Sequence, residues 1–250
     1  MDQKDLFERA YKEIGQIFKP SPSLVDFYLN RVKKYIKFVP DKKVKVLEVG
    51  SGLGSLFQDE FLIEEERNYL SILGVDFSFS AISEAEKRWN NLLNRNKSIL
   101  KKIDIKFLMR NILDKFKYDE PYDLIIDSHC LHCLNGIHEQ KKALNNMVSS
   151  LKPGGILAIE MMIYHQKISF SHPYYFDRNT SKLFKEDCWG SLIPYRTIPK
   201  SLVVENMILD EGLKIEYFTI MSNQRMIPES NREIVKEGDP QCLRIICRKT

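Results

Sequence analysis

A buried strand that runs directly into three glycines most constrains the fold of this chain. Residues 45–54 read KVLEVGSGLG, in which an apolar run is followed by Gly50, Gly52 and Gly54. Glycine permits a sharp turn and a close backbone approach to a ligand, because it carries no Cβ atom. The segment predicts a strand–turn–helix unit of an α/β sheet, with a ligand bound at the carboxyl end of the strand.

Strands and helices alternate after this unit. Apolar runs predict strands at 71–77, 103–109, 122–128 and 156–162. Helices are predicted between them at 80–95, with Ser80 as the N-cap, and at 137–151, which ends at LKPGG. This alternation indicates a parallel sheet with helices on both faces.

The two ends of the chain depart from this alternation. Helical periodicity recurs at 5–18, 23–38 and 200–212. The segments 214–221 and 241–248 read as strands with no helical crossover between them. They are therefore expected to pair as an antiparallel hairpin at the sheet edge.

Composition restricts the class of protein. The 250 residues are 43% hydrophobic and 29% charged, which is ordinary for a globular protein with a real core. A net charge of +4 does not by itself indicate nucleic acid. The charged amino terminus has no apolar h-region, and no apolar run is long enough to span a bilayer. With five cysteines, an odd number, we expect reduced thiols and a cytoplasmic location.

The motifs together resemble the class I S-adenosylmethionine-dependent methyltransferase family over roughly residues 42–250. VLEVGSGLG is similar to the family's first motif, E/D-x-G-x-G-x-G, and Asp76 ends the second strand as the family requires. LKPGG precedes the fifth strand, and a hairpin closes the chain. The resemblance implies a Rossmann-like sheet of seven mostly parallel strands, with S-adenosylmethionine as cofactor and S-adenosylhomocysteine as product.

The resemblance also implies a division of one methyltransferase domain spanning 1–250. An N-terminal helical cap, or lid, is expected at 1–40 and the cofactor-binding core at 41–162. A lid insertion, long and rich in aromatic residues, is expected at 163–199, and the C-terminal helix and hairpin at 200–250.

Cofactor-binding positions follow from the family pattern. Asp76 is expected to accept hydrogen bonds from the ribose hydroxyls, and Glu48 to order the glycine loop and approach the methionine amine. The helix after the loop is expected to turn its amino end toward the cofactor carboxylate. The remaining positions expected at the cofactor are Gly50, Ser51, Gly52, Gly54, Phe77, Ile112, Asp127 and Ser128.

The adenine position departs from the family pattern. The family usually carries an aspartate after the third strand, whereas this chain reads MRNILD, with Asn111 at the corresponding position. A side-chain amide oxygen can also accept from the adenine amino group. Arg110 and Asp114 are the alternatives if the register differs.

Other cofactor classes fit less well. A nicotinamide-binding fold needs G-x-G-x-x-G. Counted from Gly50, the third glycine of that motif would fall at position 55, where this chain has Ser55. Metal-dependent members of the family place an Asp-Asn pair after the fifth strand, where this chain reads EMMIY. We therefore expect no metal.

The stretch DSHCLHCL, residues 127–134, lies at the end of the fourth predicted strand. His129 is the candidate general base or acceptor-orienting group. His132 is a second catalytic candidate, and the alternative is a packed, hydrogen-bonded histidine. Cys130 and Cys133 are expected to be small buried side chains rather than metal ligands, because no second ligand pair is recognisable.

The methyl acceptor is open at this point. We expect a nitrogen or oxygen of a small molecule, enclosed by residues 163–199 and by the amino-terminal helices, where Tyr11 is a candidate contact. Basic runs at 31–45 and 94–106 leave RNA or protein as the alternative acceptor. A non-catalytic relative that binds the cofactor or a partner is the third possibility. No membrane partner is expected.

Overall fold

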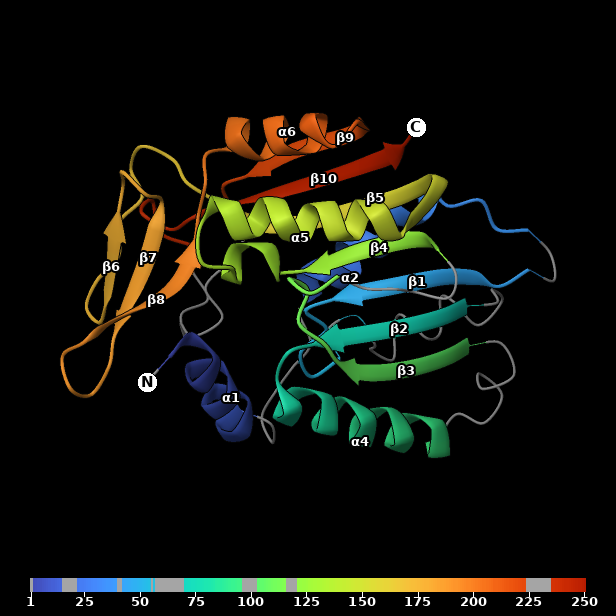
Figure 1. Ribbon diagram of the computed structural model, residues 1–250, viewed down its shortest axis with the longest axis horizontal. Coiled ribbons are helices and arrows are strands. Elements are labelled where there is room, and N and C mark those ends of the chain that lie inside the picture. Colours follow the sequence, from blue (N-terminus) through green and yellow to red (C-terminus); the bar gives the residue numbers. More distant parts are fainter. Residues whose placement is uncertain are drawn as a thin grey trace.

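A seven-stranded sheet forms the centre of the protein, whose computed structural model is shown in Figure 1. The structure describes residues 2–14, 22–39, 42–54, 56, 70–95, 103–115, 121–223 and 235–250. The strand order is β3-β2-β1-β4-β5-β10-β9. The first five of these strands run parallel, while β10 is antiparallel to both of its neighbours, β5 and β9. The expected seven-stranded, mostly parallel sheet with a closing hairpin is therefore confirmed.

The central strands of this sheet are apolar segments that are buried along most of their length, whereas the edge strands β3 and β9 are partly exposed. Their bounds are β1 (Val44–Val49), β2 (Leu70–Asp76), β3 (Ile103–Met109), β4 (Tyr122–Ser128), β5 (Leu151–Ile163), β9 (Leu213–Met221) and β10 (Gln241–Lys249). The carboxyl ends of the parallel strands meet at one edge of the sheet, since the register pairs Val49 of β1 with Val75 of β2 and with Asp127 of β4.

Helices cover both faces of the sheet, as expected. Phe27 of α2 (Pro22–Asn30) and Trp89 of α4 (Phe79–Arg95) are buried against one face. Met147 of α5 (Ile137–Ser150) and Met207 of α6 (Ser201–Asp210) are buried against the other. The remaining helical elements are α1 (Gln3–Ile14), η1 (Val32–Tyr35) and η3 (Leu131–Cys133).

Of the two amino-terminal helices, only α1 lies beyond the carboxyl edge of the sheet, where it contacts α4 and β8 (Leu192–Thr197). The side chains of Leu24, Phe27 and Tyr28 in α2 are instead part of the main core. The first predicted helix extends to residue 18, and its last residues lie outside the part of the chain that the structure describes.

Several element boundaries differ from the sequence-based expectation. The predicted N-cap is wrong, because α4 begins at Phe79 and Ala81 N–H donates to Ser78 Oγ at 3.1 Å. The hydroxyl of Ser80 instead contacts the Glu8 carboxylate of α1. The fifth strand begins at Leu151 rather than Ile156, so LKPGG belongs to the strand.

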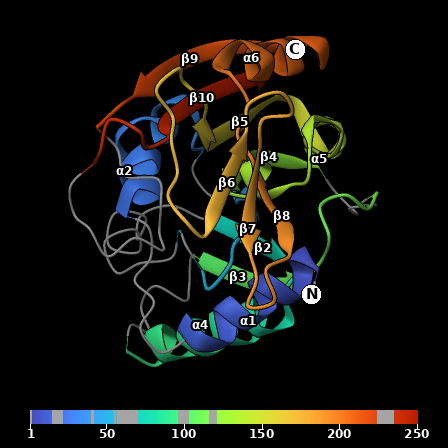
Figure 2. The same cartoon turned by 90° about the vertical axis from the view of Figure 1, so that its left-hand side faces the viewer.

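The segment expected to be a long loop at 163–199 contains a second, antiparallel sheet. It consists of β6 (Tyr174–Asp177), β7 (Lys182–Glu186) and β8, in that order. This small sheet stands beside the carboxyl edge of the large sheet, as Figures 1 and 2 show. Its Leu183 and Tyr195 pack with Met162 of β5 in a separate apolar cluster. Within the segment, the Phe176 ring contacts the rings of Tyr164 and Phe170, at centroid distances of 5.6 and 5.8 Å.

No described helix is both long enough and apolar enough to span a membrane.

Candidate active site

The glycine loop after β1 turns directly beneath the end of β4. Gly50, Gly52 and Gly54 have φ angles of +68°, +51° and +88°, a region that L-residues with side chains seldom adopt. A Cβ atom on Gly50 would lie only 2.6 Å from Cys130 Cβ. Glycine at position 50 is therefore required both by the backbone conformation and by the close approach of the two strand ends.

Asp76, at the end of β2, holds the loop in this position. Its Oδ2 accepts from Gly52 N–H at 3.0 Å and its Oδ1 accepts from Ser78 N–H at 2.9 Å. Burial raises the pKa of Asp76 to about 6, even though these hydrogen bonds favour the ionised form. Four lone-pair directions are available on a carboxylate, so Asp76 retains accepting capacity for a ligand.

Glu48 lies in β1, the strand next to β2, and is fully buried. Its Oε1 accepts from Ser128 Oγ at 2.7 Å and from Leu56 N–H at 3.2 Å. Its Oε2 is buried and has no hydrogen-bond partner among the described residues. Burial raises the pKa of Glu48 to about 8, and the charge of Asp76 adds to the shift.

Asp127, at the end of β4, shows the same pattern. Its Oδ1 accepts from the N–H groups of Leu131 and Cys130, at 2.9 and 3.1 Å, whereas its Oδ2 is buried with no partner in the described part of the chain. Burial raises the pKa of Asp127 to about 7. Two buried carboxyl groups on adjacent strand ends thus each present one unsatisfied oxygen, an arrangement that a cationic ligand would stabilise.

His129, the residue after β4, has a φ angle of +63°, which is uncommon for a residue with a side chain. Its Nε2 lies 2.7 Å from Glu160 Oε1 of β5, and the side chain is 29% exposed. The backbone oxygen of His129 accepts from the Cys133 thiol at 3.3 Å. Such a constrained residue at a strand end is a common feature of functional sites.

Glu160 is held in place by a buried polar cluster. Its Oε2 accepts from Arg244 Nε at 2.6 Å, and its Oε1 also accepts from Ser23 Oγ at 2.7 Å. Arg244 also forms an ion pair with Asp26 at 2.9 Å. Burial alone would raise the pKa of Glu160, but the His129 and Arg244 contacts hold it below its usual value. Glu160 is therefore a charged partner for His129.

His132 occupies a different environment. It is buried, and its Nδ1 accepts from Met162 N–H at 3.3 Å. Burial, followed by the charges of Arg196 and His129, lowers the pKa of His132 well below its ordinary value. These contacts are those of the packed, hydrogen-bonded histidine that the sequence left as the alternative.

A family described as "Methyltransferase domain" matches residues 40–206, which is most of the chain. This chain is a member of the methyltransferase domain family. The expected family is thereby confirmed. No curated protein matches the chain.

Solved structures share the fold of this methyltransferase at low identity. A SAM-dependent methyltransferase from Methanosarcina mazei has a TM-score of 0.62 at 17% identity, covering 87% of this chain and 96% of that one. The CcbJ methyltransferase from Streptomyces caelestis has a TM-score of 0.64 at 15% identity and 95% coverage of both chains. A methyltransferase from Clostridium acetobutylicum has a TM-score of 0.62 at 15% identity and 98% coverage of both chains.

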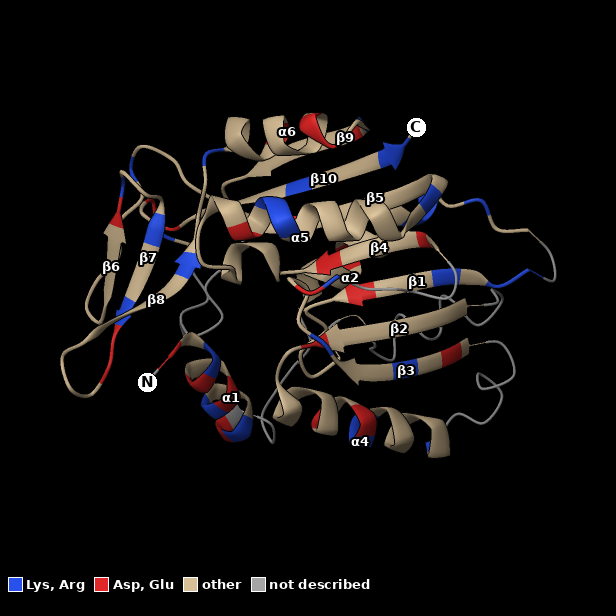
Figure 3. Cartoon of the chain, viewed as in Figure 1, with Lys and Arg blue, Asp and Glu red and all other residues tan. Residues whose placement is uncertain are grey.

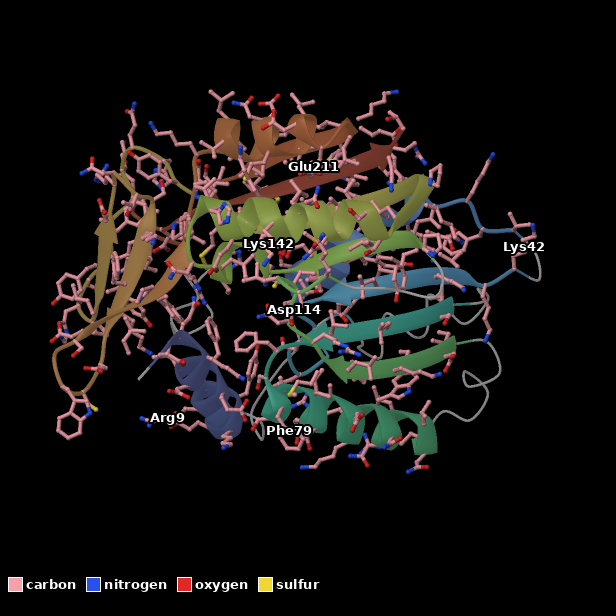
Figure 4. The ribbon with its side chains drawn as sticks, in the orientation of Figure 1. Arg9, Lys42, Phe79, Asp114, Lys142 and Glu211 are labelled. Atoms are coloured by element: carbon pink, nitrogen blue, oxygen red, sulfur yellow. The ribbon has the colours of Figure 1, made fainter. Side chains whose placement is uncertain are left out.

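The positions expected near an adenine lie after β2 and β3 of the methyltransferase. Phe77 is half-buried and its ring meets the Phe7 ring of α1 edge-on at 6.0 Å, whereas Phe79 points outward in Figure 4. Ile112 is buried. Asn111 is exposed and its Oδ1 accepts from Leu113 N–H at 3.0 Å, in a local turn. Its nearby register alternative, Asp114, is also exposed.

The helix α1 closes the far side of the candidate site. Gln3 Nε2 donates to the backbone oxygens of Cys133 and Tyr195, at 2.6 and 2.9 Å. Further along, Glu8 accepts from Ser78 Oγ at 2.5 Å. Burial raises the pKa of Tyr11 well above its ordinary value, and the neighbouring charge of Asp76 raises it further. The Tyr11 phenol therefore lies close to the ends of β2 and β4.

The pairing of Glu160 with Arg244 is not predicted by the sequence analysis. The missed signal is a charged residue inside each of two apolar strands, ILAIEMM and QCLRIICR. In the antiparallel register, Arg244 lies directly opposite Glu160. Among the described residues, no group of three or more His, Cys, Asp or Glu side chains is placed to hold a metal ion.

Proposed function

We propose that this protein transfers a methyl group from S-adenosylmethionine to a nitrogen or oxygen of a small molecule. The observation that carries the proposal is the His129–Glu160 pair, 2.7 Å apart, beside the two unsatisfied carboxyl oxygens of Glu48 and Asp127. The first pair can take up a proton, and the second pair can receive a cationic cofactor. The His129–Glu160 pair and the two unsatisfied oxygens lie at the same edge of the sheet.

The residues present fit the charges of S-adenosylmethionine. Its ammonium and sulfonium groups are positive, and the buried oxygens Glu48 Oε2 and Asp127 Oδ2 lack partners in the described structure. Glu48, Asp127 and Ser128 would hold the methionine part, and Asp76 would accept from the ribose hydroxyls. The glycine loop, Gly50 to Gly54, would bring backbone N–H groups close to the cofactor. Phe77, Asn111 and Ile112 would border the adenine.

When bound, S-adenosylmethionine supplies an electrophilic methyl group. The chain must then align the acceptor and take its proton, because a neutral amine or hydroxyl becomes cationic as it is methylated. We assign the uptake of that proton to His129. Its Nε2 donates to Glu160, which leaves Nδ1 to accept the proton, and the ionised Glu160 stabilises the resulting imidazolium. We assign no proton transfer to His132, because its position is buried and its pKa is lowered.

Enclosure of the site supports a small acceptor. The Phe7 ring of α1 stacks on Tyr195 of β8 at a centroid distance of 5.6 Å, and Tyr174 of β6 continues the row at 5.7 Å from Tyr195. This aromatic row joins α1 to the small sheet, and both border the carboxyl edge of the large sheet. Aromatic walls with a few polar groups are typical of small-molecule sites.

A macromolecular acceptor receives less support. Figure 3 shows Lys and Arg interspersed with Asp and Glu rather than collected on one face in that view. In the first basic run, Arg31 lies over the Tyr217 ring at 5.7 Å. In the second run, residues 96–102 lie outside the described residues.

Similarity of fold does not by itself establish methyl transfer. A structure described as the [4+2]-cyclase SpnF has a TM-score of 0.55 to this chain at 17% identity, covering 91% of this chain and 80% of that one. A relative without methyltransferase activity is therefore the alternative, and a direct assay must distinguish the two.

The experiment is titration calorimetry with S-adenosylmethionine, followed by measurement of S-adenosylhomocysteine release across panels of amines, phenols, carboxylates and RNA. We expect binding, and release with a small-molecule panel. His129→Ala should lower the turnover rate by about 10²- to 10⁴-fold and leave cofactor affinity unchanged. Absence of cofactor binding would refute the proposal, and binding without release on any panel would favour the non-catalytic relative.

A further inference from the structure

The β7–β8 hairpin carries an apolar tip that the protein itself does not cover. Among the described residues, Trp189 is the most exposed large apolar side chain, at 84%, and Leu192 beside it is 52% exposed. The turn is well ordered by hydrogen bonds, because Asp187 Oδ1 accepts from the N–H groups of Trp189 and Ser191, each at 2.9 Å. Trp189 is thus presented to solvent by a defined turn.

A cavity of about 610 Å³ opens beside the turn of the same hairpin. Its wall includes the apolar residues Leu192, Ile193 and Pro194. Both signs of charge border it, since Lys4 of α1 lies there together with Asp2 and Asp187. The hairpin therefore contributes residues both to the apolar tip and to the cavity.

A surface with these properties is self-complementary. A two-fold dimer uses the same patch on both subunits, so the projecting group and the hollow that receives it must lie side by side on one molecule. Trp189 and the cavity meet this requirement, because Asp187, Ser191 and Leu192 line the cavity and flank Trp189. In such a pair, Lys4 of each copy can face Asp187 of the other, so that the charges also match.

We propose that the tip of the β7–β8 hairpin is the contact between two copies of this chain, with Trp189 of each copy inserted into the cavity beside the other hairpin. Tryptophan is enriched at the centres of interfaces, and its burial removes about 150–250 Å² of surface from water. We expect a contact centred on one hairpin to bury less than the area of about 1,200 Å² that marks stable complexes. The association is therefore weak and depends on protein concentration.

This contact has a consequence for the candidate active site. Tyr195, in the strand that follows the hairpin tip, stacks on Phe7 and accepts a hydrogen bond from Gln3 at its backbone oxygen. Lys4, at the rim of the cavity, belongs to the same helix as Phe7. Association would restrict the movement of α1 and β8 together, two elements that border the site.

Tryptophan fluorescence offers a direct test, because the chain has two tryptophans and Trp89 is buried, at 7% exposure. In a Trp89→Phe variant, Trp189 is the only tryptophan, and excitation selective for tryptophan reports on it alone. We expect its emission to shift to shorter wavelength as the protein is concentrated from about 1 µM to about 200 µM, in step with a monomer-to-dimer change in sedimentation velocity. Wild-type protein should show the same change in sedimentation.

Two variants and one control complete the test. Trp189→Ala should remain monomeric over the whole range, and Lys4→Glu should weaken association at least about tenfold, because it places like charges opposite each other. Leu202→Ala removes an exposed apolar side chain from α6 and should associate like the wild type. A wild-type protein that stays monomeric would overturn the proposal, as would a dimer that Trp189→Ala does not affect or in which Trp189 emission is unchanged.

Discussion

His129 Nε2 lies 2.7 Å from Glu160 Oε1, and Arg244 Nε lies 2.6 Å from the other oxygen of the same carboxylate. A histidine at the rim of the candidate site is thus connected to a buried ion pair between β5 and β10. The arginine keeps Glu160 ionised, and the ionised Glu160 orients the imidazole. The orientation of His129 therefore depends on a residue of the last strand.

Removal of the cation should destabilise the fold. Arg244→Met leaves the Glu160 charge buried without its ion-pair partner, which typically costs about 3–5 kcal/mol. We expect a loss of this size in the free energy of unfolding, measured by urea denaturation. The double variant Glu160→Gln/Arg244→Met should lose clearly less than the sum of the two single variants, because it carries no unpaired charge. Simple additivity would contradict a direct coupling of the two residues.

Substitution of Gly50 should be far more costly than substitution of another glycine with the same backbone angle. Gly50→Ala places a Cβ atom 2.6 Å from Cys130 Cβ, whereas Gly212, at φ +72°, has nothing within 4 Å of the corresponding position. Gly212→Ala therefore tests the cost of the backbone conformation alone, about 1 kcal/mol. We expect Gly50→Ala to lower the unfolding free energy by at least about 1 kcal/mol more. If thermal unfolding showed equal losses of stability in the two variants, Cys130 would be able to move away from the new Cβ atom without destabilising the fold.

Asp76 should matter for the cofactor in two ways, through its ribose contacts and through the glycine loop. Asp76→Ala removes the acceptor for Gly52 N–H and for Ser78 N–H, and we expect S-adenosylmethionine affinity to fall at least about tenfold. Titration calorimetry measures the change. Asp104→Ala, at an exposed carboxylate near the amino end of β3, is the matched control and should bind nearly as well as the wild type. A normal affinity in Asp76→Ala would exclude the proposed ribose role.

Stability of the ligand-free protein should fall as the pH rises. The pKa values of Glu48, Asp127 and Asp76 are raised to about 8, about 7 and about 6 in the folded protein, above the ordinary values of 4.5, 3.8 and 3.8. A raised value means that the fold favours the protonated group. The corresponding stability is fully present below the ordinary values and is lost as the pH passes through about 6 to about 8.

Thermal unfolding between about pH 5 and about pH 9 would record this loss. S-adenosylmethionine should raise the melting temperature more at the upper end of the range, because the cation binds the ionised carboxylates. Glu48→Gln carries no titrating group at that position and should show a flatter profile. A stability that rises over this range would contradict the assignment of buried, protonated carboxyl groups.

The large sheet could be predicted from the sequence because each of its strands is a local apolar run, and parallel order follows from the helices between them. The small sheet was missed, since β6 and β7 are only four and five residues long and their aromatic residues show no regular burial. The N-cap error has a similar cause. Ser78 and Ser80 are equally good candidates locally, and Glu8, distant in sequence, binds both.

The position of the candidate site could be predicted from the sequence, but two of its side-chain contacts could not. Gly50, Asp76 and the end of β4 converge because parallel strands end at one edge of the sheet. Two contacts depend on how neighbouring strands align in the folded protein. They are the contact of Asp76 with Gly52 and that of Glu160 with Arg244. Neither is encoded in a short motif, although a lone charge within an apolar strand marks the second pair.

The side-chain amide of Gln3 joins η3 to β8 by donating to the backbone oxygens of Cys133 and Tyr195. A molecule that entered between α1 and these two elements would have to break both hydrogen bonds. The Gln3 amide would then slow both the entry and the exit of a ligand by this path, more than it would change how tightly the ligand is bound.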